Sequence, residues 1–178
     1  MSDVAWFSRK DKGAVDDRDE QRPGSAAPEG ADADLPEYDP GVPLRPRINP
    51  VGDEEQQRIA AGLAALAAEG VDVDDLASLG AAYDAALAAW HATSKRHRED
   101  DAVVTERFAI GIGEHLARHT DLGWSLVRDA FGTDLAVAGG RDEFVVVPSN
   151  LVTARWFNGE SGWLPGVVGH LVRVRASR

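Results

Sequence analysis

Three polar side chains near the end of a predicted helix are the first candidates for chemistry in this sequence. Glu114, His115 and His119 form an E-H-x-x-x-H pattern, and the i, i+4 spacing places both histidines on one helix face. Such a set suits general acid–base catalysis or metal binding. In the helical zinc sites of proteases the glutamate stands between the histidines, whereas here it precedes both, and the spacing indicates no third ligand. We therefore expect a structural or surface histidine pair, with no metal and no cofactor.

Two carboxylates that flank a predicted hairpin, Asp129 and Asp134, extend this candidate polar site. In a hydrolase or transferase, a carboxylate would act as the base, a histidine as its acid–base partner, and an arginine would bind an anion. The residues available for these three roles are Glu114 or Asp129, His115 or His119, and Arg128 or Arg155. Carboxylates at hairpins commonly bond turn amides, however, and Glu114 can pair with Arg118 one helical turn on. Because no nucleophile elbow or cofactor loop accompanies the set, an enzyme is the less favoured hypothesis.

A pair of glycines, in Gly111-Ile112-Gly113, lies inside the same predicted helix. Glycine is unfavourable in a helix by about 1 kcal/mol, so the pair predicts either a close approach of another backbone or a bend. A phosphate-binding loop is the disfavoured alternative, because the stretch follows no strand and lacks both the third glycine and a Lys-Ser/Thr ending.

Three amphipathic helices are predicted in residues 53–119. The first begins at Asp53 and ends before Gly70, the second begins near Asp74, and the third covers residues 102–119. Their apolar side chains recur every three or four residues, which indicates core faces, although a partner helix is an alternative for the second stripe. The three stripes are Ile59, Leu63 and Leu66; Leu76, Leu79, Tyr83, Leu87 and Trp90; and Val104, Phe108, Ile112 and Leu116.

From Leu122 onward the hydrophobic period changes to two, which predicts strands. Alternating or continuous apolar runs are found in residues 124–129, 135–137 and 144–147, and Gly132 and residues 139–142 suit the two reversals. Helices are then expected in residues 151–157 and 165–174. The predicted fold class is α+β, with helices packed around a three-stranded antiparallel meander.

Residues 1–52 are predicted to form a disordered acidic arm rich in Pro, Gly and Ala, followed by a single domain in residues 53–178. Two islands interrupt the arm. Trp6-Phe7 and the basic residues up to Lys12 could contact a partner groove or an anionic surface, or could be an ordinary exposed terminus. Residues 38–48 could lie extended across the domain as a clasp, or could be a loose linker.

Charge and composition restrict the possible partners and compartments. The net charge is −11, and no basic stripe is long enough to follow a phosphate backbone, so nucleic acid is not expected as a partner. The chain has no cysteine, which excludes disulfides, thiolate nucleophiles and cysteine-based metal sites. It contains no long apolar run and no signal-peptide core, so we expect no membrane span and a cytoplasmic location.

A set of short motifs resembles a known family. The motifs are Gly113-Glu114-x-Leu116, Gly123-Trp124, Asp129-x-x-Gly132-Thr133-Asp134-Leu135-Ala136-Val137, Val147-Pro148-Ser149 and Arg155-Trp156. Between Val103 and Phe157 the chain is similar to the Domain of Unknown Function 3806 family of bacterial proteins. The resemblance implies an α+β domain with a leading helix, a short meander and a following helix. It implies no particular activity.

The favoured functional hypothesis is a non-enzymatic protein-interaction module with an unknown protein partner. Trp and Arg are enriched at binding hot spots, so Arg155, Trp156, Phe157 and Trp163 are the candidate contact surface, with core packing as the alternative for these side chains. Besides an enzyme, the remaining hypothesis is a small-molecule or peptide sensor. Its pocket would lie between the meander and the last helices and would be lined by Trp124, Phe131, Trp156 and Trp163.

Overall fold

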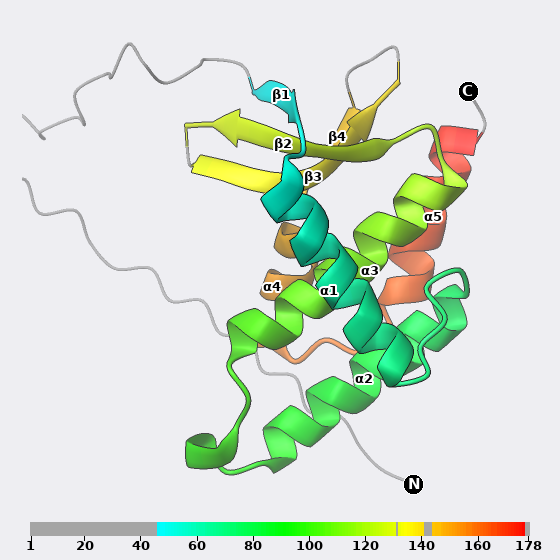
Figure 1. The fold of residues 1–178 in the computed structure, drawn as a ribbon. Helices are drawn as coiled ribbons and strands as arrows, with labels where there is room; N and C mark the ends of the chain where they lie inside the picture. The colour runs from blue at the N-terminus through cyan, green and yellow to red at the C-terminus, as the bar shows by residue number, and fades with distance from the viewer. Residues whose placement is uncertain (1–45, 131, 141–143, 177–178) are drawn as a thin grey trace, which may run out of the picture. The chain divides into compact units, whose positions relative to one another are not determined.

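The computed structural model describes residues 46–130, 132–140 and 144–176. Within these ranges, five α-helices and a four-stranded antiparallel sheet form the α+β fold that the sequence predicts (Figure 1). The strands are β1 (Arg47–Pro50), β2 (Gly123–Asp129), β3 (Gly132–Gly139) and β4 (Phe144–Val146). The helices are α1 (Asp53–Ala68), α2 (Leu76–Ala92), α3 (Asp101–His119), α4 (Pro148–Asn158) and α5 (Leu164–Ala176).

The sheet has the strand order β1-β2-β3-β4, so the prediction of three strands is wrong by one edge strand. Strand β1 pairs antiparallel with β2, with Ile48 opposite Val127 and Pro50 opposite Ser125. All four residues of β1 are exposed, and proline is tolerated here because an edge strand leaves one side of its backbone outside the ladder. Main-chain pairing with a neighbouring strand leaves no hydrophobic pattern, which is why the sequence did not reveal β1.

Strand β1 belongs to the stretch predicted to be the N-terminal arm. The division of the chain at residues 52 and 53 therefore remains a prediction. The predictions for residues 1–45, including the Trp6–Lys12 island and most of the possible clasp, lie outside the described residues.

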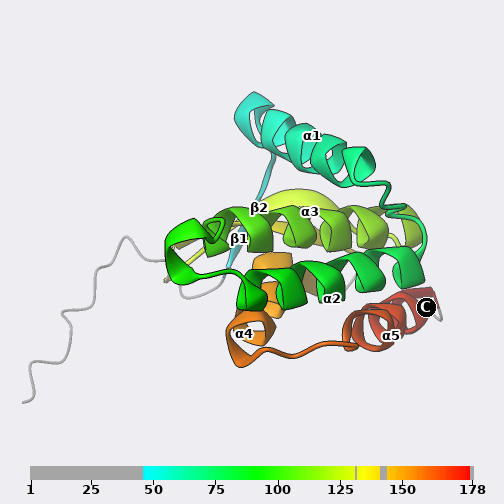
Figure 2. The ribbon, with the colours of Figure 1, turned by 90° about the horizontal axis from the view of Figure 1, so that it is seen from below.

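Helix α3 is the centre of the fold. It contacts each of the other four α-helices and also β2 and β3. When the molecule is seen from below, α1 lies on one side of α3, while α2, α4 and α5 lie on the opposite side (Figure 2). The predicted α3 stripe is confirmed, since Phe108, Ile112 and Leu116 are fully buried and Val104 nearly so. Residues on the other faces of α3 are buried as well, including Thr105, Ala109, Ile110 and His115, because neighbours surround the helix.

The two glycines of α3 lie where side chains of neighbouring elements pack most closely against the helix. A Cβ on Gly111 would lie 2.8 Å from Leu66 of α1 and 2.9 Å from Leu79 of α2. A Cβ on Gly113 would overlap the ring of Trp124. The sequence predicted either a close approach of another backbone to these glycines or a bend. Side chains approach them instead, because a large side chain fits against α3 only where the helix carries no Cβ.

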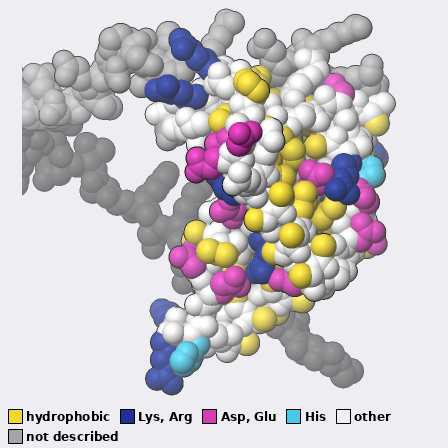
Figure 3. Space-filling model, viewed as in Figure 1, with side chains coloured by type: hydrophobic (Ala, Val, Ile, Leu, Met, Phe, Trp, Pro, Cys, Tyr) yellow, Lys and Arg dark blue, Asp and Glu magenta, His cyan; other side chains and the backbone are white. Residues whose placement is uncertain are grey.

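Helix α1 is peripheral and packs on α3 through Ile59, Gly62 and Leu66. Its outer face carries exposed alanines, and Figure 3 shows hydrophobic side chains gathered over this helix. The first turn of α1 is closed by Glu55, whose side chain accepts a hydrogen bond of 2.9 Å from the backbone N–H of Gly52. This bond satisfies one of the free amides at the helix start and holds the Glu55 carboxylate beside it.

Helix α4 begins three residues earlier than predicted, at Pro148. Proline suits the first turn because it lacks the N–H that would have no helical partner there. The preceding residue, Val147, provides no side-chain cap. The helix ends at Asn158, and the following residue, Gly159, adopts the left-handed conformation with φ of 67° and allows the chain to turn toward α5.

Candidate functional site

The E-H-x-x-x-H residues form a structural cluster at the C-terminal end of α3. Glu114 accepts two hydrogen bonds, 2.8 Å from Nε of Arg118 and 2.9 Å from Nε1 of Trp124. Arg118 also donates to Asp74 at 2.8 Å, which connects α3 to the segment before α2. Bonding to these two carboxylates raises the pKa of Arg118. Both oxygens of Glu114 are therefore engaged with protein donors.

The two histidines of this cluster differ in environment. His115 is buried, and its Nδ1 donates to the backbone oxygen of Val73 at 2.8 Å. Burial lowers the pKa of His115, because a charged imidazolium would lose its hydration. His119 is partly exposed, and its Nε2 lies 3.3 Å from Oδ1 of Asp74. The ring centroids are 4.3 Å apart, so the prediction that both histidines share one face is confirmed.

The carboxylates of the predicted hairpin lie elsewhere. Asp129 is the last residue of β2 and pairs with Gly132 across the turn. Asp134 lies on β3 opposite Val127. Its neighbour Leu135 faces a groove that the sequence did not reveal, so the Asp134 side chain points to the opposite face of the sheet. Among the described residues, no group of three or more His, Asp or Glu side chains is arranged to hold a metal ion.

The groove has a volume of about 540 Å³ and lies between α1, α3, the helix-facing side of the sheet and the start of α4. Trp124 and Leu126 of β2 and Leu135 of β3 lie on this side of the sheet, with Leu126 directly opposite Leu135. The residues that line the groove are Glu55, Arg58, Asp101, Ala102, Thr105, Glu106, Ala109, Ile110, Trp124, Leu126, Thr133, Asp134, Leu135, Pro148, Ser149 and Thr153. We call this the acidic groove, because α1 and α3 contribute three carboxylates, from Glu55, Asp101 and Glu106, and one cationic side chain to it.

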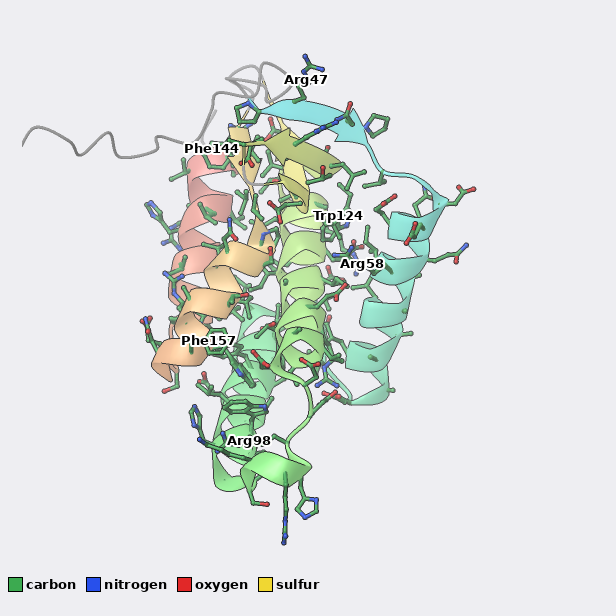
Figure 4. All side chains as sticks on the ribbon, turned by 90° about the vertical axis from the view of Figure 1, so that its left-hand side faces the viewer. Arg47, Arg58, Arg98, Trp124, Phe144 and Phe157 are labelled. Carbon is green, nitrogen blue, oxygen red and sulfur yellow. The ribbon has the colours of Figure 1, made fainter. Side chains whose placement is uncertain are left out.

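Arg58 supplies that cation and forms an ion pair with Glu106 between α1 and α3. Figure 4 shows Arg58 and Trp124 close together in the space between α1, α3 and the sheet. The hydroxyl of Thr105 donates to the backbone of its own helix at 2.7 Å. The groove thus combines an apolar floor with an acidic rim.

Trp124 belongs to both regions. Its ring lines the acidic groove and covers Gly113, while its indole N–H is held by Glu114. Glu114 therefore positions a wall of the groove through Trp124. This contact also explains two of the motifs that carry the family resemblance, because Gly113-Glu114 and Gly123-Trp124 meet there.

The candidate contact surface divides into buried and exposed parts. Trp156 has no exposed surface and packs edge-to-face on Tyr83, with ring centroids 5.7 Å apart, so core packing describes this residue. The guanidinium of Arg155 lies over the ring of Trp163, 4.5 Å from its centroid, and both residues are half-buried. Phe157 is 63% exposed and projects from the end of α4 (Figure 4).

The aromatic pocket proposed for a sensor is not assembled as expected. Trp163 packs against Tyr83 with ring centroids 5.5 Å apart, and burial raises the pKa of the Tyr83 hydroxyl. Trp156 and Trp163 therefore belong to a packed interior, Trp124 lines the acidic groove, and Phe131 lies outside the described residues.

Sequence reasoning missed Glu55, Arg58, Asp101 and Glu106 as members of a common site. Each one is an ordinary exposed or capping residue on its own helix, and no spacing along the chain relates α1 to the start of α3. Only the packing of α1 on α3, beneath the sheet, brings them together.

Comparison with known proteins gives one relationship. None of the helices in the described residues has the length and apolarity needed to span a membrane. No curated protein and no solved structure matches the chain. A protein-family model described as Domain of unknown function (DUF3806) matches residues 84–165, which confirms the resemblance and extends it from Val103 back into α2. The matched residues, 84–165, run from α2 to the start of α5.

Proposed function

We propose that this protein is a non-enzymatic interaction module that binds a segment of a partner protein in the acidic groove. The observation that carries the proposal is the groove itself, a cavity of about 540 Å³ whose floor is apolar and whose mouth includes the exposed residues Ala102 and Thr133. Concave sites with an apolar lining and a few polar groups are the usual binding sites of proteins.

The polar residues considered for catalysis support binding over catalysis. A general base needs an oxygen or nitrogen free to reach a substrate proton. Glu114 already accepts from Trp124 and Arg118, and His115 is buried with its Nδ1 on Val73. These groups hold α3 against the segment before α2 and against the sheet. Their hydrogen bonds therefore stabilise the fold.

A pair of adjacent substitutions in the first turn of α3 tests the proposal. Ala102→Trp places a large ring in the acidic groove, whereas Val103→Trp places the same ring on a neighbouring exposed position outside it, since Val103 is 54% exposed and does not line the groove. Both substitutions leave the Asp100 cap on the backbone N–H of Ala102 available. Circular dichroism would establish that both variants fold.

The full chain and both variants would be used as bait in quantitative pull-downs from the lysate of the source cells. We expect a stoichiometric partner that is retained by the wild type and Val103→Trp and is lost from Ala102→Trp. A partner retained equally by all three baits would place the binding surface elsewhere, and the exposed Phe157 would be the next position to substitute. The absence of any enriched partner would contradict the interaction module.

A further inference from the structure

We infer that the segment bound in the acidic groove is a cationic amphipathic peptide, in which an apolar side chain is flanked by arginine or lysine. The inference rests on the proposed function and adds the chemistry of the partner. It follows from three features of the groove: its apolar floor, the carboxylates around that floor, and the way in which the groove already binds one guanidinium.

The floor provides the contact for the apolar side chain. Ile110 of α3, Leu126 of β2 and Leu135 of β3 present aliphatic groups, and the ring of Trp124 adds an aromatic surface. Side chains of intermediate exposure, such as Leu126 and Leu135, still have apolar area that a partner can cover. Removing apolar area from water favours binding, so an anchoring leucine or similar residue would supply much of the affinity.

The carboxylates provide the preference for positive charge. Glu55 lies in the first turn of α1 and Asp101 at the start of α3, so they belong to different walls of the groove. Within the part of the chain that the structure describes, neither carboxylate is hydrogen-bonded to a side chain or paired with a cation. Two such carboxylates at the border of an apolar surface create a negative potential that favours cations and repels anions.

Arg58 shows that a guanidinium is accommodated in this groove. Its side chain reaches from α1 to Glu106 of α3 and lies near Trp124 (Figure 4). A planar guanidinium can bind a carboxylate through its N–H groups while its faces remain free to contact apolar or aromatic groups. Arginines of a partner would bind Glu55 and Asp101 in the same manner, leaving the Arg58–Glu106 pair in place.

A set of three labelled peptides tests this inference on the full chain. The first peptide carries leucines flanked by arginines, the second replaces each arginine with citrulline, and the third replaces each arginine with glutamate. Citrulline keeps the shape of arginine without its charge, so the comparison isolates the electrostatic contribution. Dissociation constants would be measured by fluorescence anisotropy at low and high salt, and unlabelled spermidine and free arginine would be tested as competitors.

We expect the arginine peptide to bind roughly fivefold to tenfold more tightly than the citrulline peptide, as two partly exposed ion pairs would contribute. The glutamate peptide should bind most weakly, and high salt should reduce the advantage of arginine. The double variant Glu55→Gln/Asp101→Asn should remove most of that advantage. Its matched control is Glu54→Gln/Glu160→Gln, which removes the same charge from two exposed residues outside the groove and should preserve the advantage.

Several outcomes would overturn the inference while leaving the proposed function intact. Equal affinities for the arginine and citrulline peptides, both lost in Ala102→Trp, would mean that the groove binds peptides without charge recognition. An equal loss of the arginine advantage in the control double variant would assign it to the net charge of the protein. Displacement by spermidine as effective as displacement by the unlabelled peptide would identify a small cation as the occupant. Failure of all three peptides to bind would overturn the inference, whereas the proposed function depends on the pull-down.

Discussion

The indole of Trp124 donates a hydrogen bond of 2.9 Å from Nε1 to Oε2 of Glu114, which joins the first strand of the hairpin to the central helix. The bond fixes the orientation of a ring that is at once part of the core and a wall of the acidic groove. The integrity of the proposed binding site therefore depends on a contact between strand β2 and helix α3.

Removing the acceptor of this bond should destabilise the protein. Glu114→Ala leaves the indole N–H of Trp124 and one guanidinium N–H of Arg118 without this partner, and we expect a loss of about 1–3 kcal/mol in the free energy of unfolding. Glu114→Gln retains an amide oxygen for Trp124 and should lose less. Urea unfolding of the three proteins measures the difference, and equal losses for Ala and Gln would show that the hydrogen bond to Trp124 is unimportant.

A methyl group at Gly113 should also be unfavourable, although alanine is the better helix former by about 1 kcal/mol. Its Cβ would lie 2.7 Å from Cζ2 and 2.8 Å from Cζ3 of Trp124. Displacing a packed indole should destabilise the protein by about 1–3 kcal/mol. Gly166→Ala in α5 is the control, because nothing lies within 4 Å of its added Cβ and helix propensity should dominate. A stabilised Gly113→Ala would show that Trp124 can move at little cost.

The buried imidazole of His115 makes stability depend on pH. Because burial lowers its pKa in the folded state, the unfolded chain binds a proton at higher pH than the folded chain does. The contribution of His115 is therefore complete above the unfolded value of about 6.5 and is lost as pH falls below it, with a slope of at most about 1.4 kcal/mol per pH unit. Urea unfolding between pH 8 and about pH 5 should show this decline, and His115→Gln should reduce it. An identical pH dependence in the variant would assign the decline to other groups.

The last helix is secured by a buried guanidinium. The side chain of Arg175 is 3% exposed and donates to Asp121 from Nε at 2.9 Å and from Nη2 at 2.6 Å, and its guanidinium lies 5.2 Å from the ring centroid of Phe144 in β4. Lysine cannot reproduce this two-pronged geometry. We expect Arg175→Lys to lower the thermal midpoint, with a loss of about 1–2 kcal/mol because Asp121 is half exposed. The exposed Arg96→Lys should be neutral, and a neutral Arg175→Lys would show that charge alone suffices.

The sequence-based predictions were correct where hydrophobic periodicity and turn residues occur close together along the chain. The α3 stripe of Val104, Phe108, Ile112 and Leu116 was found because a helix that packs against other elements repeats its buried positions every three or four residues. The hairpin at Gly132 was found because alternation and turn residues occur within a few residues of each other. Strand β1 was missed because an exposed edge strand is held by its backbone, whose pairing leaves no trace in the side-chain pattern.

The candidate polar site shows that contacts between distant segments could not be predicted from the sequence. Glu114, His115 and His119 were correctly placed on one helix, but their partners, Trp124, Val73 and Asp74, come from other segments and could not be inferred from spacing. Trp156 and Trp163 were identified as large anchors, yet whether such side chains contact a partner or the core depends on which elements cover them. Both tryptophans pack against Tyr83, which is far away in the sequence, and therefore contribute to the interior.

By itself, the sequence determined the fold class, the helical stripes, the hairpin and the family resemblance, because each of these depends on residues close together along the chain. The tertiary structure alone decided that Glu55 and Arg58 of α1, Asp101 and Glu106 of α3, and Leu135 of β3 surround one groove. The physical reason is that this convergence depends on how α1 and the sheet pack against α3. That packing is set by long-range contacts, such as Gly62 on Ile110 and Trp124 on Gly113, which no local pattern encodes.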